Sequence, residues 1–363
     1  MSAAGDDAAV EPAVLVRVHD GLGHLTLNRP RSINALSYEM VELMQSALDS
    51  WADDSAVRLV VIDGAGERGL CAGGDIVAIY SDARAGGTAS IDYWAAEYRL
   101  DATIADYPKP VVALMDGIVM GGGVGISTHA SHRIVEENST IAMPEVGIGF
   151  VPDVGGLFLL ARAPGQLGLH AALTGARMGP ADAIHLGFAD AFVPRGQRGE
   201  LLTALSTGDV DGAIARLAVV PPPSPLAAER HWIDLAYDRD SIEEVLAALD
   251  SLSGDGPERA RTILARSSPT SLKVALRSFR EAAADPDLHS ALVRDLRIAA
   301  RCLAGHDFTE GIRAQVIDKD RNPRWRPATL AEVSAADVDA YFAPLGERDL
   351  HLDRSSPSTG ARR

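Results

Sequence analysis

The sequence predicts an α/β core followed by a helical region. In the first half, short β-branched runs alternate with amphipathic helical patterns, and two glycine-rich segments each follow such a run. After about residue 195 the patterns are mostly helical. We therefore expect a disordered leader at residues 1–12, the α/β core at 13–195, a helical C-terminal region at 196–345 and a disordered tail at 346–363.

The first elements of the core follow from local patterns. Residues 14–18 and 24–27 flank Asp-Gly-Leu-Gly at 20–23, which predicts a β-hairpin. Ser37 is expected to cap a helix that runs to about Trp51, because apolar residues recur there at steps of three and four. These apolar residues are Met40, Val41, Met44, Ala47, Leu48 and Trp51.

The later elements follow from the same patterns. We expect strands at residues 58–62, 111–115 and 133–135, and a helix at 91–105 that ends before Pro108. The Pro-rich residues 221–225 predict a stiff connector. Further helices are expected at residues 241–252, 257–265, 271–284, 287–304 and 308–317.

Composition and charge exclude several classes of protein. The 363 residues are 47% hydrophobic and 23% charged, as in ordinary globular proteins, and no apolar run reaches the ~18 residues of a membrane span. The net charge of −16 disfavours binding to nucleic acid or to an anionic membrane. Cys71 and Cys302 are expected to be reduced thiols, and the first residues lack the features of a signal or transit peptide. We therefore expect a cytoplasmic protein.

Two glycine-rich corners are the first candidates for chemistry. Gly73 and Gly74 follow one predicted strand, and Gly121, Gly122 and Gly123 follow another. Glycine lets the backbone approach a ligand closely, with its N–H free to donate. Two such corners suggest two N–H donors that converge on one oxygen, an oxyanion hole. The alternative is that both corners are merely tight turns.

Acidic residues in apolar sequence are the second candidate. Glu145 lies in Met-Pro-Glu, and Asp153 lies in Pro-Asp-Val-Gly-Gly. Carboxyls in apolar surroundings have raised pKa values and can take part in proton transfer. The alternative is that Glu145 caps a helix or pairs with a distant arginine. Glu97, taken alone, is typical of a solvated helix residue.

Other motifs do not fit their usual chemistry. Residues 64–69 match G-x-G-x-x-G but do not open a clear helix, so a surface turn is favoured over a dinucleotide site. His129 and His132 lie three apart without an evident third ligand, so we predict no metal site. Cys71 lies beside a candidate oxyanion loop, but without an obvious partner histidine a buried thiol is favoured over a nucleophile.

Six segments, taken together, resemble the enoyl-CoA hydratase/isomerase (crotonase) superfamily. They are Leu-Asn-Arg-Pro at 27–30 with Asn-Ala-Leu at 34–36, Cys-Ala-Gly-Gly-Asp at 71–75, Lys-Pro-Val-Val-Ala at 109–113, the glycines at 121–123, Met-Pro-Glu at 143–145 and Pro-Asp-Val-Gly-Gly at 152–156. The second half resembles the 3-hydroxyisobutyryl-CoA hydrolase branch. Its matching segments are residues 268–274, 307–314, 317–320 and 323–327.

The resemblance implies a fold and a set of roles. The fold is a spiral of ββα units with a helical C-terminal region. Gly74 and Gly122 match the two N–H donors that hold a thioester carbonyl oxygen. Glu145 matches the catalytic glutamate, Asp153 matches the acidic residue of the hydrolase branch, and Glu97 matches a glutamate of that branch that contacts the substrate.

One departure from the hydratase pattern bears on the activity. Hydratases usually carry a second glutamate three residues after the middle glycine, where this chain has Gly125. The resemblance therefore implies hydrolysis of a short 3-hydroxyacyl-CoA, most specifically 3-hydroxyisobutyryl-CoA in valine catabolism. The alternatives are an enoyl-CoA hydratase/isomerase and a non-catalytic acyl-CoA-binding protein.

The expected partners follow from this reaction. Coenzyme A is part of the substrate, and no metal or other cofactor is expected because hydrolysis moves no electrons. Arg29, Arg31 and Lys109 are candidates to bind the CoA phosphates, with ordinary surface charges as the alternative. The family also implies a possible homo-oligomer.

Overall fold

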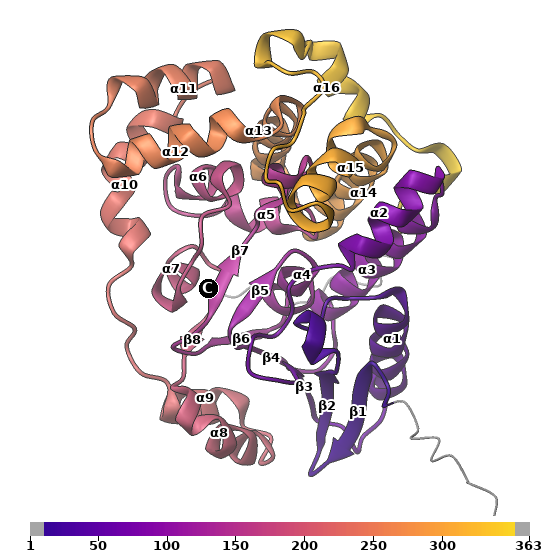
Figure 1. Ribbon diagram of the computed structural model, residues 1–363. Helices are drawn as coiled ribbons and strands as arrows, with labels where there is room; N and C mark the ends of the chain where they lie inside the picture. Colours follow the sequence, from indigo (N-terminus) through magenta and orange to yellow (C-terminus); the bar gives the residue numbers. More distant parts are fainter. Residues whose placement is uncertain (1–10, 353–363) are drawn as a thin grey trace, which may run out of the picture.

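The fold is built on one large sheet, seen in a computed structural model that describes residues 11–352 (Figure 1). The strand order is β1-β2-β3-β4-β6-β8, in which β1 and β2 are antiparallel and the other neighbours are parallel. A second sheet pairs β5 with β7 in parallel. The strands are β1 (Val14–His19), β2 (Leu22–Leu27), β3 (Leu59–Gly64), β4 (Val111–Met115), β5 (Ile118–Met120), β6 (His132–Val135), β7 (Thr140–Ala142) and β8 (Ala191–Phe192).

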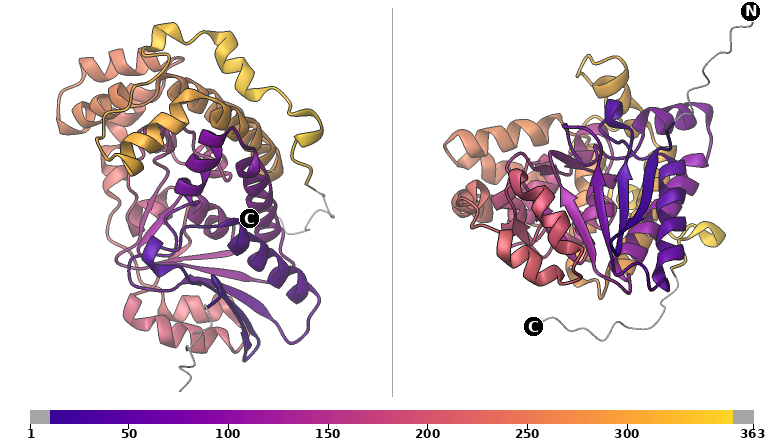
Figure 2. Two further views of the ribbon diagram at one scale, coloured as in Figure 1. Left: turned by 45° about the vertical axis from the view of Figure 1, so that its right-hand side comes forward. Right: turned by 90° about the horizontal axis from the view of Figure 1, so that it is seen from below.

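Helices cover both faces of the large sheet because its central strands are apolar on both sides. In β3, Val60 and Ile62 belong to the core shared with α1 and α3, whereas Leu59 and Val61 belong to the core shared with α8 and α9. Figure 2 shows these helix pairs on opposite sides of the sheet. Their bounds are α1 (Tyr38–Ala52), α3 (Ala89–Ala105), α8 (Arg198–Leu205) and α9 (Val210–Leu217).

The chain repeats a unit of two strands and a helix. In the first unit β1 and β2 both join the large sheet before α1. In two later units the first strand joins the large sheet and the second joins the small sheet, as β4 and β5 do before α4 and as β6 and β7 do before α5. This is the spiral of ββα units that the family resemblance implies. The other helices of this part are α2 (Ile76–Ala85), α4 (Gly122–Thr128), α5 (Gly156–Leu160), α6 (Leu167–Thr174) and α7 (Pro180–His185).

The predicted local structure of the first elements is confirmed. The hairpin turns through Asp20 and Gly21, which both have positive φ. Ser37 caps α1, and its side chain accepts a hydrogen bond from the N–H of Met40 at 3.3 Å. The six apolar residues expected on the inner face of α1 are all buried.

The helical C-terminal region is also confirmed, and it packs over one end of the core (Figure 1). Its helices are α10 (Pro225–Tyr237), α11 (Ile242–Ser251), α12 (Asp255–Arg266), α13 (Pro269–Ala284), α14 (Leu288–Ala304), α15 (His306–Ile312) and α16 (Ala335–Phe342). The pattern predicted for residues 308–317 ends instead as a π-helix over Arg313–Ile317. The helices that were not predicted are α2, α5, α6, α7, α8, α9, α10 and α16.

The expected leader and tail lie largely outside the described residues. Only Glu11 and Pro12 of the expected leader lie within the described residues. In the expected tail, Leu350 is buried and the Asp349 carboxylate accepts two hydrogen bonds from Arg297, so these two residues pack on the fold, whereas residues 353–363 lie outside the described part. Cys71 and Cys302 are free and buried, as predicted. None of the helices in the described part is long and apolar enough to cross a membrane.

Candidate active site

Two glycine corners each carry a backbone N–H that has no hydrogen-bond partner among the described residues. Leu36 pairs with the residues on either side of Gly74: its N–H donates to Gly73 O and its carbonyl accepts from the Asp75 N–H, both at 2.9 Å. The N–H of Gly74 is left out of this pairing. Gly122 is the first residue of α4, where an N–H has no partner inside the helix. Both donors are therefore available to a ligand.

Asn34 holds the first glycine corner in place. Its side-chain amide donates to the carbonyl oxygens of Ala65, Gly69 and Leu70 at 3.0, 3.2 and 3.1 Å, and its side-chain oxygen accepts from the Arg29 N–H at 2.9 Å. The residue has φ 52°, a conformation that asparagine tolerates better than most residues. One buried side chain thus fixes the path of the backbone that leads to Gly74.

A cavity of about 180 Å³ lies beside the two corners. One wall is aromatic: the rings of Trp94 and Phe150 stack with centroids 5.4 Å apart, and Phe308 lies 4.6 Å from Phe150. Phe308 belongs to α15, so the C-terminal region completes the cavity. The cavity is lined by Ala72, Gly73, Gly74, Ile76, Ile79, Trp94, Glu97, Met120, Gly121, Gly122, Pro144, Glu145, Ile148, Phe150, Asp153 and Phe308.

Glu97 points from α3 toward the second glycine corner. A Cβ atom added at Gly122 would lie 2.1 Å from Glu97 Oε1, so the carboxyl occupies the space that a side chain at Gly122 would need. Tyr93 donates its hydroxyl hydrogen to the same oxygen at 3.0 Å. Glu97 is 2% exposed, which corrects the interpretation of this residue as solvated. Burial, and then the charge of Asp153, raise the pKa of Glu97.

Glu145 and Asp153 lie on the same cavity and are both buried. Tyr98 donates its hydroxyl hydrogen to Asp153 Oδ2 at 2.6 Å. Burial raises the pKa of Asp153 to about 6, although the Tyr98 hydrogen bond acts in the opposite direction. Burial and the charge of Asp153 raise the pKa of Glu145, whose Oε2 has no hydrogen-bond partner among the described residues.

The alternative interpretation of Glu145 does not hold. The residue opens the short 3-10 helix η2 (Glu145–Ile148) without capping it through its side chain, and no described arginine pairs with its carboxyl. Its Oε1 lies 3.4 Å from a Cβ atom added at Gly121, next to the donor at Gly122. The structure therefore brings Gly74, Gly122, Glu145, Asp153 and Glu97 to one cavity.

Asp101 is a buried acid that sequence reasoning missed. It lies one helical turn beyond Glu97 on α3 and is 0% exposed, and both its oxygens lack a hydrogen-bond partner among the described residues. A Cβ atom added at Gly125 would lie 2.7 Å from each oxygen. Position 125 therefore has no room for the glutamate that hydratases carry there. The spacing of Tyr93, Glu97 and Asp101 at four-residue steps was the signal that could have revealed this acidic face of α3.

The three basic candidates have different surroundings. Arg29 forms an ion pair with Asp75 at 3.0 Å, directly after the first glycine corner. Arg31 lies exposed on the surface. Lys109 precedes β4, at the opposite end of the strand from the site, and its ammonium donates to Asp54 O at 2.7 Å. The structure thus does not bring Lys109 to the site, because the carboxyl end of β4 leads to Gly122.

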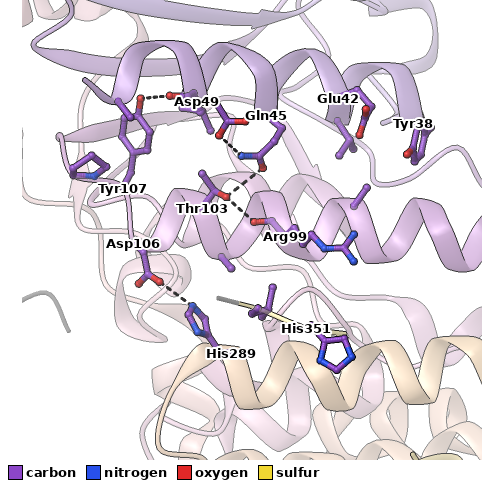
Figure 3. A pocket seen from close by; sticks show the side chains of 17 residues that line it. Tyr38, Glu42, Gln45, Asp49, Arg99, Thr103, Asp106, Tyr107, His289 and His351 are labelled. Carbon is purple, nitrogen blue, oxygen red and sulfur yellow. Dashed lines mark hydrogen bonds and ion pairs between the residues drawn. The ribbon is translucent and has the colours of Figure 1, made fainter. Parts of the chain in front are cut away.

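A larger cavity of about 500 Å³ lies elsewhere, between α1, α3 and α14 (Figure 3). Its polar side chains pair with one another: Gln45 donates to Asp49 at 2.8 Å, and His289 contacts Asp106 at 2.9 Å. On α3 it is lined by residues such as Arg99, which lie on a different face of the helix from Glu97. The cavity contains none of the predicted site residues. Within the described chain, no group of three or more His, Cys, Asp or Glu is placed to hold a metal ion.

A spiral of ββα units with two free amides beside buried carboxyls defines a protein of the crotonase fold class. The enoyl-CoA hydratase/isomerase family model matches residues 22–342, and the chain belongs to this family. The 3-hydroxyisobutyryl-CoA hydrolase of Gallus gallus is 40% identical over 93% of this chain and 91% of its own length. The human enzyme of that name is 36% identical over 95% of this chain and 91% of its own length. The predicted resemblance to this branch is confirmed.

Solved structures agree on the fold, and their proteins are described by other activities. A protein from Mycobacterium thermoresistibile, described as a carnitinyl-CoA dehydratase, is 51% identical with a TM-score of 0.91, over 94% of this chain and 99% of that one. A protein from Rhodobacter sphaeroides, described as an enoyl-CoA hydratase, is 43% identical with a TM-score of 0.89, over 94% of this chain and 100% of that one. Both likenesses extend over the core and the helical region.

Proposed function

We propose that this protein hydrolyses a short 3-hydroxyacyl-CoA thioester, namely 3-hydroxyisobutyryl-CoA, to 3-hydroxyisobutyrate and CoA. One observation carries the proposal: two unpaired backbone donors and two buried carboxyls, Glu145 and Asp153, line a single cavity. The names of the relatives, which are about 40% identical over more than nine-tenths of the chain, support this substrate.

The first step is the binding of the thioester carbonyl. Its oxygen accepts hydrogen bonds from the N–H groups of Gly74 and Gly122, which together form an oxyanion hole. Negative charge develops on this oxygen when the carbonyl carbon is attacked. Each preorganised donor lowers the barrier by roughly 3 kcal/mol because it stabilises the transition state more than the substrate.

Glu145 brings the oxygen nucleophile to the carbonyl carbon. It either attacks directly to give an anhydride, or removes a proton from a water molecule that attacks. In both routes the C–S bond breaks and a C–O bond forms. The net reaction consumes one water, and the thiolate of CoA takes up a proton. In the general-base route the water oxygen ends in the acid, whereas in the anhydride route it ends in the acid or in the Glu145 carboxylate, according to which carbonyl carbon the water attacks.

Asp153 assists the attack of water or the protonation of the CoA thiolate. A carboxyl whose pKa burial raises to about 6 exchanges a proton readily near neutral pH. We assign to Asp153 the orientation of the water or the protonation of the departing thiolate. Glu97 binds the 3-hydroxyl of the substrate, and Arg29 and Arg31 remain candidates for the CoA phosphates. The reaction requires no metal or redox cofactor.

The test is release of free thiol from a panel of acyl-CoAs with and without a 3-hydroxyl. The wild type should release thiol fastest from 3-hydroxyisobutyryl-CoA. Glu145→Gln should abolish turnover without lowering the unfolding midpoint, and Glu42→Gln on the exposed face of α1 is the matched control. Near-wild-type turnover by Glu145→Gln would remove Glu145 from the mechanism. After a single turnover in labelled water, label in the Glu145 carboxylate would establish the anhydride route, and label in the acid alone would exclude attack of water on a Glu145 anhydride carbonyl.

A hydratase or dehydratase activity is the second candidate. In its favour, the two solved structures reported above are described as a dehydratase and a hydratase. Against it, position 125 is a glycine where hydratases carry their second glutamate, and Asp101 fills the space beside this glycine. With crotonyl-CoA, loss of the conjugated-thioester absorbance before free thiol appears would favour hydration.

The cellular location and the oligomeric state of the protein have tests of their own. We propose a cytoplasmic location, whereas the vertebrate relatives are named as mitochondrial proteins. Fractionation of the source cells with an antibody against this chain distinguishes the two. Sedimentation of the purified protein tests the possible homo-oligomer, and neither nucleic acid nor membrane is proposed as a partner.

A further inference from the structure

The loop that carries Asp153 is a strained turn. The N–H of Gly156 donates to Asp153 O at 2.6 Å, which closes a β-turn around Val154 and Gly155. Both central residues have positive φ, 50° and 70°, which is the signature of a type I′ turn. Asparagine, aspartate and glycine dominate these positions, whereas a β-branched valine is unfavourable there.

Two side chains from distant parts of the chain hold this turn. His129 lies 2.7 Å from Val154 O through Nε2, and the carbonyl can only accept, so Nε2 carries the hydrogen. Burial lowers the pKa of His129 to about 4, so at neutral pH the ring is neutral with its proton on Nε2. On the other side, the Gly155 N–H donates to Asp295 Oδ2 at 2.9 Å.

The two side chains come from the end of α4 and from α14. His129 directly follows the last residue of α4, the short helix that begins with the donor at Gly122. Its ring also packs against the turn, because a Cβ atom added at Gly155 would lie 2.9 Å from Nε2. Asp295 lies on α14 and is 3% exposed. Helix α4 therefore fixes the N–H donor at one end and the Asp153 turn at the other.

We propose that His129 and Asp295 are positioning residues that hold the Val154 peptide in its strained conformation and thereby aim the Asp153 carboxyl into the cavity. Strain of this kind persists only where the surroundings over-determine it. The inference rests on the proposed part of Asp153 in hydrolysis. Neither His129 nor Asp295 lines the cavity, so both act through the turn.

Matched pairs of variants test the two contacts. His129→Gln keeps an amide donor at a similar reach, and His129→Leu removes it. Asp295→Asn keeps an acceptor, and Asp295→Leu removes it. We expect kcat to fall about tenfold or more in the leucine variants, with KM within about twofold of wild type, because misplacement of a reacting group acts on the chemical step. The Gln and Asn variants should stay within about threefold of wild-type kcat.

Rescue by glycine distinguishes positioning from a merely structural role. Val154→Gly removes the strain, since glycine adopts positive φ as readily as negative φ. In that background His129→Leu should lower kcat by a clearly smaller factor than in the wild type. An equal loss of kcat in both backgrounds, or a wild-type kcat in His129→Leu, would overturn the inference.

A readout without turnover separates this inference from the proposed function. If the wild type released no thiol from any acyl-CoA, the proposed function would fail, and the turn would be tested through urea unfolding. Positioning of a strained turn predicts that His129→Leu lowers the unfolding midpoint less in the Val154→Gly background than alone. Additive effects of the two substitutions would refute the coupling between the ring and the turn, even in a protein that hydrolyses its substrate normally.

Discussion

Replacing Asp153 by asparagine should make the protein more stable and less active. The carboxyl is 7% exposed, and burial raises its pKa from the ordinary value of 3.8 to about 6. Burial of a charge without a cationic partner costs free energy, whereas asparagine is neutral and still accepts the Tyr98 hydrogen bond. Thiol release should fall mainly through kcat, because the group acts on the reacting atoms.

The size and sign of the stability change follow from linkage. Between pH 3.8 and about 6, the unfolded chain loses the Asp153 proton while the folded protein keeps it. The free energy of unfolding of the wild type therefore falls as pH rises through this window and is constant above it. A pKa difference of this size corresponds to about 3 kcal/mol. Asp153→Asn should thus match the wild type near pH 4 and exceed it by up to ~3 kcal/mol at pH 8.

Urea unfolding from pH 4 to pH 8 measures this difference. The control is Glu42→Gln, since Glu42 is exposed in the folded protein and its charge is hydrated in both states. The free-energy difference for the control should be nearly constant with pH. A stability difference for Asp153→Asn that is the same at pH 4 and pH 8 would refute the claim that burial of this carboxyl destabilises the folded protein.

Three further predictions concern packing and capping. Gly122→Ala should lower kcat about 10²-fold or more, as for loss of an oxyanion donor, because the added Cβ atom would overlap the Glu97 carboxyl and displace the N–H. The control is Gly199→Ala, which should leave kcat unchanged because nothing lies within 4 Å of the added atom. Ser37→Ala should lower the free energy of unfolding by about 1 kcal/mol through loss of the α1 cap, and an unchanged urea midpoint would contradict this. Phe308→Ala should cost about 3–5 kcal/mol in urea unfolding because its ring is 2% exposed, and a cost under about 1 kcal/mol would contradict its place in the core.

Periodicity predicted those elements whose packing follows from their own sequence. The inner face of α1 and the hairpin around Gly21 are examples, because local turn chemistry and a clear apolar stripe point to the same structure. Helices α8 and α9 were missed, although they cover one face of the sheet. Each has only eight residues, so the pattern is short, and their partners Leu59 and Val61 lie on β3, far away in the chain.

The site residues also divide into those that the local sequence predicts and those that depend on distant packing. Gly74, Gly122, Glu145 and Asp153 stand in motifs whose residue types alone suggest chemistry, and they meet at one cavity. Glu97 looked solvated because the sequence of a helix does not reveal which other elements pack against its polar residues. The partners of the Asp153 turn were missed for a similar reason, since a contact made by α14 depends on how the C-terminal helices pack.

The aromatic wall has a consequence for synthesis of the chain. Phe308 emerges from the ribosome long after the residues that carry the carboxyls and the two amides. A nascent or truncated chain that ends before α15 therefore lacks one wall of the cavity, although every carboxyl and both glycine amides of the proposed site have already been made.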